Sequence, residues 1–170
     1  MLHVDLTRVP EYYHRYIERA SMDDLPTALQ KHFNNINPLL ESLPPAKWDY
    51  RYAEGKWSIK EMVQHLIDAE RIFCYRALCF ARQDKTPLPG FDENEYVIHS
   101  NADRRTPVDL VKELAMVNLS TMQLFNSFDE TQLDQEGLAN GKSVYVKGIA
   151  YIIIGHVLHH KAVLEERYLP

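Results

Sequence analysis

The chain has 170 residues, of which 45% are hydrophobic and 25% are charged, and its formal net charge is −5. The negative charge and the lack of a basic stripe argue against a nucleic-acid partner, and no apolar run reaches the roughly 18 residues that cross a membrane. The length suits one domain with a sizeable core. We predict that residues 1–170 form a single domain, in which residues 1–22 are an N-terminal extension packed on the rest.

The N-terminus and the cysteines bear on the cellular compartment. The first residues lack the basic and then apolar layout of a signal peptide. Cys74 and Cys79 lie five residues apart in one predicted helix, a rise of about 7.5 Å that is too long for a disulfide. We therefore expect reduced cysteines and a cytoplasmic location.

The first predicted element is a short helix from Pro10 to Ala20, with proline in its first turn. Its three tyrosines, Tyr12, Tyr13 and Tyr16, are expected to form an aromatic flap over the rest of the protein.

A longer helix is predicted from about residue 24 to residue 43. Asp23 or Asp24 caps its start, and Pro38 is expected to kink or loosen its middle. Its apolar residues recur every three or four positions, at Leu25, Leu29, Phe33, Ile36 and Leu40. A single histidine between such residues, His32, is typical of a surface or hydrogen-bonded position, so we leave it out of the predicted site.

The second long helix begins with a capping signal and carries an inward histidine. Ser58 is the expected N-cap, Glu61 completes a capping box, and the helix continues to about Gln83. His65 falls on the apolar line of this helix. The preceding aromatic loop, residues 48–57, either forms a pocket wall or simply packs.

Three charged residues of the same helix are candidates for roles near His65. Glu61, one turn before it, and Asp68, about one turn after it, are placed to orient an imidazole. Arg76 is placed to meet an anionic substrate. Each also has a structural interpretation, because Glu61 is a capping residue, Asp68 an exposed helical charge and Arg76 a partner for a salt bridge at the rim.

Two connections flank a third long helix. Residues 86–100 contain two prolines and a glycine and are predicted to be a surface crossover with at most a short helix. The third helix runs from about Thr106, its N-cap, to Phe128, with Pro107 in the first turn. Residues 129–142, which contain Gly137, Asn140 and Gly141, are predicted to return the chain to the last helix.

The last predicted helix runs from Ser143 to Tyr168 and contains two histidines one turn apart. His156 and His160 lie on or near its core-facing stripe, whereas His159 points about 120° away, so we prefer the pair His156 and His160. One interpretation is two core histidines that each donate to a carbonyl or a carboxylate. The other is a shared cation, which would satisfy two imidazoles in a surrounding of isoleucine and valine.

Four long helices and little strand signal predict an all-α fold, a four-helix bundle with long crossover connections. Neighbouring helices of a bundle pack about 8–10 Å apart, so an inward His65 can meet His156 and His160 across one interface. Three neutral imidazoles around a divalent ion leave positions open for water or substrate, as in catalytic zinc sites. We expect zinc or nickel first, with iron, cobalt and manganese left open.

Two other kinds of metal site fail on spacing. A zinc metalloprotease needs His-Glu-x-x-His, but Val157 occupies the place of the glutamate. A di-iron carboxylate bundle needs a pair of Glu-x-x-His motifs, and no such pair occurs.

Three segments carry a resemblance to a known family. They are Lys56 to Arg71 (KWSIKEMVQHLIDAER), Gly155 to His160 (GHVLHH) and Glu165 to Tyr168 (EERY), and the turn Pro89 to Glu93 (PGFDE) is also similar. Over roughly residues 25–168 the chain resembles the DinB/YfiT family of bacterial metal-dependent four-helix bundles.

The resemblance implies a metal site made by His65, His156 and His160. Characterised relatives include bacillithiol S-transferases and mycothiol-dependent isomerases, in which the metal activates the thiol of a small cofactor, and family members are often homodimers. By this resemblance we expect thiol S-transferase-like chemistry, with a small-molecule thiol and a small electrophile as partners and a homodimer as the assembly. The alternatives are a metal-dependent hydrolase and a non-catalytic metal-binding bundle of the stress response.

Overall fold

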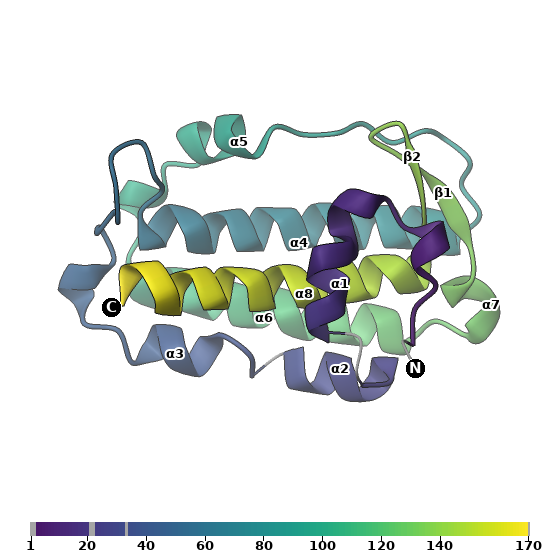
Figure 1. Cartoon of the computed structure of the whole chain (residues 1–170), viewed down its shortest axis with the longest axis horizontal. Helices are drawn as coiled ribbons and strands as arrows, with labels where there is room; N and C mark the ends of the chain where they lie inside the picture. The colour runs from purple at the N-terminus through teal and green to yellow at the C-terminus, as the bar shows by residue number, and fades with distance from the viewer. Residues whose placement is uncertain (1–2, 21–22, 33, 170) are drawn as a thin grey trace.

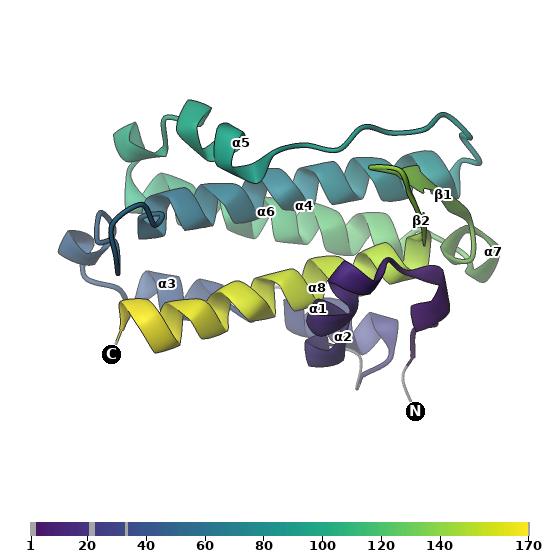
Figure 2. The same cartoon turned by 45° about the horizontal axis from the view of Figure 1, so that its top comes forward.

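The computed structural model describes residues 3–20, 23–32 and 34–169 (Figure 1). Three long helices lie side by side along the long axis of the molecule: α4 (Ile59–Ala81), α6 (Pro107–Asn126) and α8 (Val146–Val163). Two shorter helices, α2 (Leu25–His32) and α3 (Asn37–Glu41), follow one another along one side and complete the bundle (Figure 2). The predicted all-α four-helix bundle is confirmed.

The fourth side of the bundle differs from the prediction of one continuous helix over residues 24–43. The helix stops after His32 and a new one begins at Asn37, with Pro38 in its first turn. Proline has no amide hydrogen and its ring collides with the carbonyl four residues earlier, so Pro38 is accepted at a helix start and breaks a helix interior. Phe33, which we assigned to the apolar stripe, lies outside the described residues.

The two longest helices begin where their capping signals predict. Ser58 accepts from the amide of Glu61 and Glu61 accepts from the amide of Ser58, which is the predicted capping box of α4. Thr106 caps α6, with Pro107 as its first residue. Side-chain oxygens at these positions satisfy amides that have no partner within the helix.

The connection over residues 129–142 contains regular structure that the sequence analysis did not predict. This segment holds a short helix, α7 (Glu130–Leu133), and the strands β1 (Glu136–Ala139) and β2 (Lys142–Tyr145), which pair antiparallel. The strands are joined by Asn140 and Gly141, both with positive φ, a backbone that these two residue types adopt readily. As β2 extends to Tyr145, α8 begins at Val146 and not at Ser143, and it ends in a π-helical turn over Leu164–Tyr168.

The crossover between α4 and α6 carries the expected short helix, α5 (Glu93–His99), and attaches to the hairpin. Leu88 donates its amide to Leu138 and accepts from the amide of Asn140. The crossover and the hairpin therefore lie together beside the end of α4 (Figures 1 and 2).

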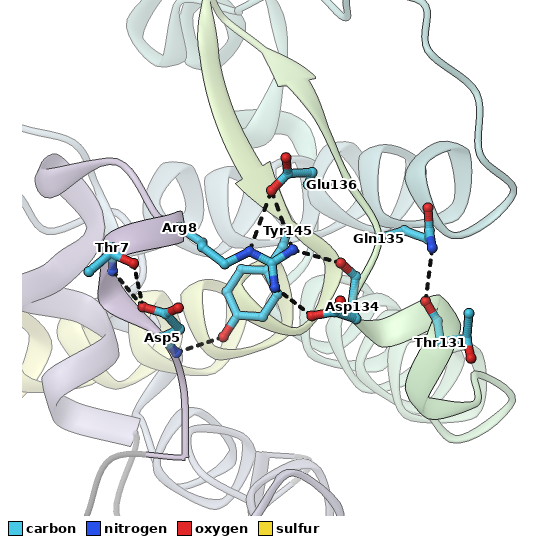
Figure 3. A network of polar contacts seen from close by, with 8 residues as sticks. All are labelled: Asp5, Thr7, Arg8, Thr131, Asp134, Gln135, Glu136 and Tyr145. Carbon is cyan, nitrogen blue, oxygen red and sulfur yellow. Dashed lines mark hydrogen bonds and ion pairs between the residues drawn. The ribbon is translucent and has the colours of Figure 1, made fainter.

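The N-terminal segment is fastened to the hairpin before it reaches the bundle (Figure 3). Arg8 pairs with Asp134 and Glu136, and its guanidinium lies 4.5 Å from the centre of the Tyr145 ring. The backbone amide of Asp5 donates to the Tyr145 hydroxyl over 2.8 Å. These contacts fix the segment on the hairpin and on the start of α8.

From there the chain enters α1 (His14–Ala20), which crosses α8 (Figure 1). The two helices meet at Gly155, where a β-carbon would come within 3.0 Å of the backbone of Tyr16. Only glycine permits this approach, and it sets α1 against the residue that precedes His156.

The buried core has two parts that meet at the histidines. One includes Ala69 of α4 and Ile153 of α8, and the other includes Leu66 and Val157 of the same two helices. Among the described residues, no helix is long and apolar enough to cross a bilayer.

Candidate metal centre

The described residues contain one group of metal-ligand side chains whose donor atoms all lie within 4.8 Å of one another: His65, His156 and His160. The Nε2 atom of His156 lies 3.1 Å from Nε2 of His65 and 3.1 Å from Nε2 of His160. We call these three residues the histidine cluster. The structure thus brings together the three histidines that the sequence predicts.

Helix geometry explains this convergence. His156 and His160 are one turn apart on α8, so their rings lie on one face, and α4 packs against that face and presents His65. His159 is left outside the cluster, and its ring lies 5.2 Å from that of Tyr16.

Burial keeps the three imidazoles neutral. It lowers the pKa of His65 to about 4. Burial, reinforced by the other histidines, holds the pKa of His156 and of His160 well below the usual value. At neutral pH each ring therefore has a nitrogen lone pair, which is the form that binds metal ions.

The cluster fits a divalent ion, because the protein alone cannot satisfy its contacts. A ring nitrogen carries either one hydrogen or one lone pair, so Nε2 of His156 serves only one of its two 3.1 Å neighbours. Three lone pairs directed at one cation remove this conflict. With metal–nitrogen bonds of about 2.1 Å and angles of 90–110°, ligand nitrogens lie roughly 3.0–3.4 Å apart, which agrees with the two separations of 3.1 Å from His156.

Aromatic rings hold two of the imidazoles in place. The Trp57 ring lies 4.8 Å from that of His65, and the Tyr16 ring meets the His156 ring edge-on at 5.5 Å. Trp57 belongs to the loop that we expected to form a pocket wall or to pack, and it lines a cavity, whereas Trp48 of the same loop is buried in the core.

The cluster opens into a cavity of about 770 Å³. Its walls come from the N-terminal segment, α4, the crossover, the hairpin and α8. The lining includes Tyr13, Tyr16, Trp57, Phe73, Arg76 and Phe91. This volume lies within the range of sites for small organic molecules and far exceeds the space of a water molecule.

The charged residues predicted to act near His65 lie in three different places. The Glu61 carboxylate pairs with Arg51 and accepts from the Ser58 amide, and Asp68 accepts from Gln64 over 2.9 Å. No hydrogen bond found among the described residues joins Glu61 or Asp68 to the cluster. Arg76 lines the cavity, and it donates to the backbone carbonyl of Pro89.

Two features of the structure, one of them in the site, were not predicted. The hairpin supplies part of the cavity wall through Asn140, Lys142 and Val144, and the Asn-Gly turn was the signal that would have revealed it. The second feature is a buried contact between His32, which we had excluded as a ligand, and the carboxylate of Glu70. A contact between residues of two different helices, such as His32 and Glu70, leaves no periodic pattern in the sequence.

Known proteins share this fold. The chain is 28% identical over 152 residues to a protein of Oceanobacillus iheyensis whose name proposes a metal-dependent hydrolase, a match that covers 85% of this chain and 86% of the other. YfiT of Bacillus subtilis, for which a metal-dependent hydrolase with an unusual four-helix bundle topology has been proposed, superposes with a TM-score of 0.72 at 16% identity. That superposition covers 84% of this chain and 82% of YfiT.

A mycothiol-dependent maleylpyruvate isomerase superposes with a TM-score of 0.69 at 14% identity, over 94% of this chain and 62% of the isomerase. Among families, the DinB superfamily matches residues 28–164, a span that contains all three histidines of the cluster. This match covers most of the bundle, and the chain therefore belongs to the DinB superfamily.

Proposed function

We propose that the chain is a metal-dependent enzyme that joins a small thiol, through its sulfur, to a small electrophile. The observation that carries this proposal is the position of three neutral imidazoles on the wall of a cavity large enough for an organic ligand. A divalent ion at such a site supplies a positive charge that lowers the pKa of a thiol or water beside it.

The described part of the protein offers no serine, threonine or cysteine nucleophile at this place. The described residues that line the cavity include no serine, threonine or cysteine. Cys74 contacts the hydroxyl of Thr121, and burial raises the pKa of its thiol to about 12, which keeps it protonated. This composition favours a nucleophile that enters with the ligands, either as a thiol or as water.

The walls favour a thiol with an organic body. The rings of Tyr13, Phe73, Trp57 and Phe91 line the cavity, and aromatic surface of this kind binds apolar parts of a ligand and displaces water from the reacting atoms. Trp57 and Tyr16, packed on His65 and His156, hold those two rings in one orientation.

The direct test combines purified untagged protein, one divalent metal at a time, a panel of thiols and monobromobimane. In the expected reaction the sulfur forms a bond to the bimane carbon, bromide leaves, and the thiol proton goes to solvent. We expect a metal-dependent rate with at least one of bacillithiol, mycothiol and glutathione. Rates equal to those of the metal-free control with every thiol would refute the proposal.

Hydrolysis is the second candidate, and the names proposed for YfiT and the Oceanobacillus protein favour it. It predicts cleavage of activated esters that needs the metal and no added thiol. The third candidate, a bundle that binds metal without turnover, expects a site sealed by side chains, and the open cavity counts against it. The homodimer stays a prediction, which sedimentation of the purified chain would test.

A further inference from the structure

Arg76 is a buried cation without a carboxylate partner. Its side chain is on the inner face of α4 and the residue is only 5% exposed. It donates to the Pro89 carbonyl over 2.7 Å, and its guanidinium carbon lies 5.7 Å from the centre of the Phe73 ring and 5.9 Å from that of Phe91. None of the ion pairs among the described residues includes Arg76.

A guanidinium in this position is costly to bury. Arginine does not lose its proton in proteins, so Arg76 cannot become neutral, and a buried charge normally requires an opposite charge. Burial lowers the pKa of Arg76, and the Tyr13 hydroxyl opposes this effect only in part. One carbonyl and one phenol leave most of its five N–H donors available.

The acidic groups of the cavity do not fill this role. Glu11 and Glu93 belong to its lining, but both are exposed at the rim and neither forms an ion pair with Arg76. Lys142, also exposed at the rim, adds a second positive charge. The buried part of the cavity near Arg76 is therefore positive and lacks a counter-ion from the protein.

Arg76 and the histidine cluster lie along one wall of the cavity. On α4, Arg76 lies eleven residues after His65, which is about three helical turns. The two side chains therefore project from the same face of the helix. Phe73 stands between them, because its ring is 5.7 Å from the Arg76 guanidinium carbon and 6.4 Å from the His156 ring. These two distances place the guanidinium carbon at most about 12 Å from the His156 ring. A molecule with the length of a tripeptide, about 10 Å, spans this separation when its ends contact Arg76 and the cluster.

We propose that Arg76, with the Tyr13 hydroxyl beside it, binds a carboxylate of the small molecule whose opposite end reaches the histidine cluster. The planar guanidinium presents paired N–H groups that match the two oxygens of a carboxylate. The inference rests on the proposed function in one respect, because it describes the ligand of the same cavity. It assigns the ligand class as a carboxylate-bearing molecule of tripeptide size.

The test measures binding and not turnover. S-methylglutathione has two carboxylates and no free thiol, and its diethyl ester has the same body without the negative charges. Calorimetry compares the affinities of both probes for the unsubstituted full chain. We expect the acid to bind roughly tenfold more tightly than the ester.

Three substitutions locate the source of this preference. Arg76→Met is expected to reduce the ratio of the two affinities to about one, and Arg76→Lys to restore part of it. Arg82→Met is the matched control, because it removes one positive charge from an exposed position just after the same helix. That variant should keep the full ratio.

Equal affinities for acid and ester in the unsubstituted chain, including no binding of either, would overturn the proposal. So would a full preference retained by Arg76→Met. Circular dichroism and thermal unfolding check that each variant is folded, and the comparison in the unsubstituted chain needs no variant. A clear acid preference together with no thiol transfer would count against the proposed function alone.

Discussion

The backbone of Tyr16 lies directly on Gly155, so closely that a β-carbon at position 155 would come within 3.0 Å of the Tyr16 carbonyl group. The next residue on α8 is His156, whose ring the Tyr16 side chain meets edge-on. One contact between two helices thus positions the aromatic wall of the cavity and a member of the histidine cluster.

Gly155→Ala should therefore disturb both the stability and the site. Alanine favours a helix by about 1 kcal/mol over glycine, but here its methyl group meets backbone that cannot rotate away, so α1 must move. We expect a net loss of about 1–3 kcal/mol in the free energy of unfolding, measured by denaturant, and a weaker metal affinity.

Gly148→Ala is the matched control on the same helix. There the β-carbon would meet the side chains of Val9 and Tyr145, far from the cluster, and side chains yield more readily than backbone. We expect this variant to keep the metal affinity of the unsubstituted chain. An equal loss of metal affinity in both variants would contradict the role of the contact between Tyr16 and Gly155.

Replacing single histidines should distinguish the metal ligands from His159, which lies beside the cluster. His160→Ala or His65→Ala removes one of three ligands, and at roughly 3 kcal/mol for each ligand the metal affinity should fall about a hundredfold or more. His159→Ala should keep one ion per chain, because the His159 ring packs on Tyr16 and lies outside the cluster. Elemental analysis of untagged protein measures the outcome, and a loss of metal in His159→Ala would contradict this assignment.

Local signals explain which parts of the fold were predictable. Ser58 with Glu61, and Thr106 with Pro107, act within a few residues of themselves, and the helices begin where these signals stand. The same holds for the spacing of His156 and His160 on one helix. Pro38, in the first turn of α3, could be recognised in the sequence as a disturbance of a helix. Whether it kinks the helix or ends it depends on how the neighbouring helices pack.

The hairpin and the cavity depend on contacts between distant segments. The two strands of the hairpin have only four residues each. The apolar residues of β2 continue into α8, so the sequence pattern from Ser143 onward predicts one helix. Gly137 reveals the tertiary cause: a β-carbon there would collide with the Phe80 ring of α4. Such a contact leaves no periodic pattern in either segment.

Arg8→Ala should loosen the N-terminal wall of the cavity. The substitution removes two ion pairs, a bond to the Asp134 carbonyl and the contact with the Tyr145 ring (Figure 3). Because these groups are partly exposed and screened by water and salt, we expect a loss of only about 1 kcal/mol in stability. Amide hydrogen exchange across α1 should become faster.

The control for this prediction is Lys31→Ala, which removes an exposed ion pair with Asp23. It should leave the exchange of α1 unchanged. The difference between Arg8→Ala and the unsubstituted chain should shrink at high salt, since part of the interaction is electrostatic. Unchanged exchange in Arg8→Ala at low salt would show that the segment is held by its apolar contacts alone.

Glu70 should make the stability of the bundle depend on pH in the acidic range. Its carboxylate is buried and accepts from Thr121 over 2.6 Å and from Asn118 over 2.9 Å, with His32 at 3.3 Å. Burial raises the pKa of Glu70, but His32, Thr121 and Asn118 outweigh it, so the pKa is lower in the folded chain than the usual 4.5. The ionised form is therefore stabilised by folding.

The sign of the effect follows from linkage. A depressed carboxyl pKa contributes stability that is complete above the unfolded value of 4.5, and this contribution is lost as the pH falls below it. Glu70→Gln cannot ionise, and at pH 7 we expect it to be less stable by about 3 kcal/mol, because donors arranged for a carboxylate would face an amide. The gap should narrow as the pH falls below 4.5.

Chemical denaturation of both chains at several pH values measures this gap. The cluster histidines titrate in both, so their contribution cancels in the difference. Glu95→Gln, at an exposed position of α5, is the control and should follow the unsubstituted chain at every pH. A gap that stays constant from pH 7 down to pH 3 would mean that Glu70 is not held as a carboxylate, and the contacts with Thr121 and Asn118 would then have to be those of a protonated acid.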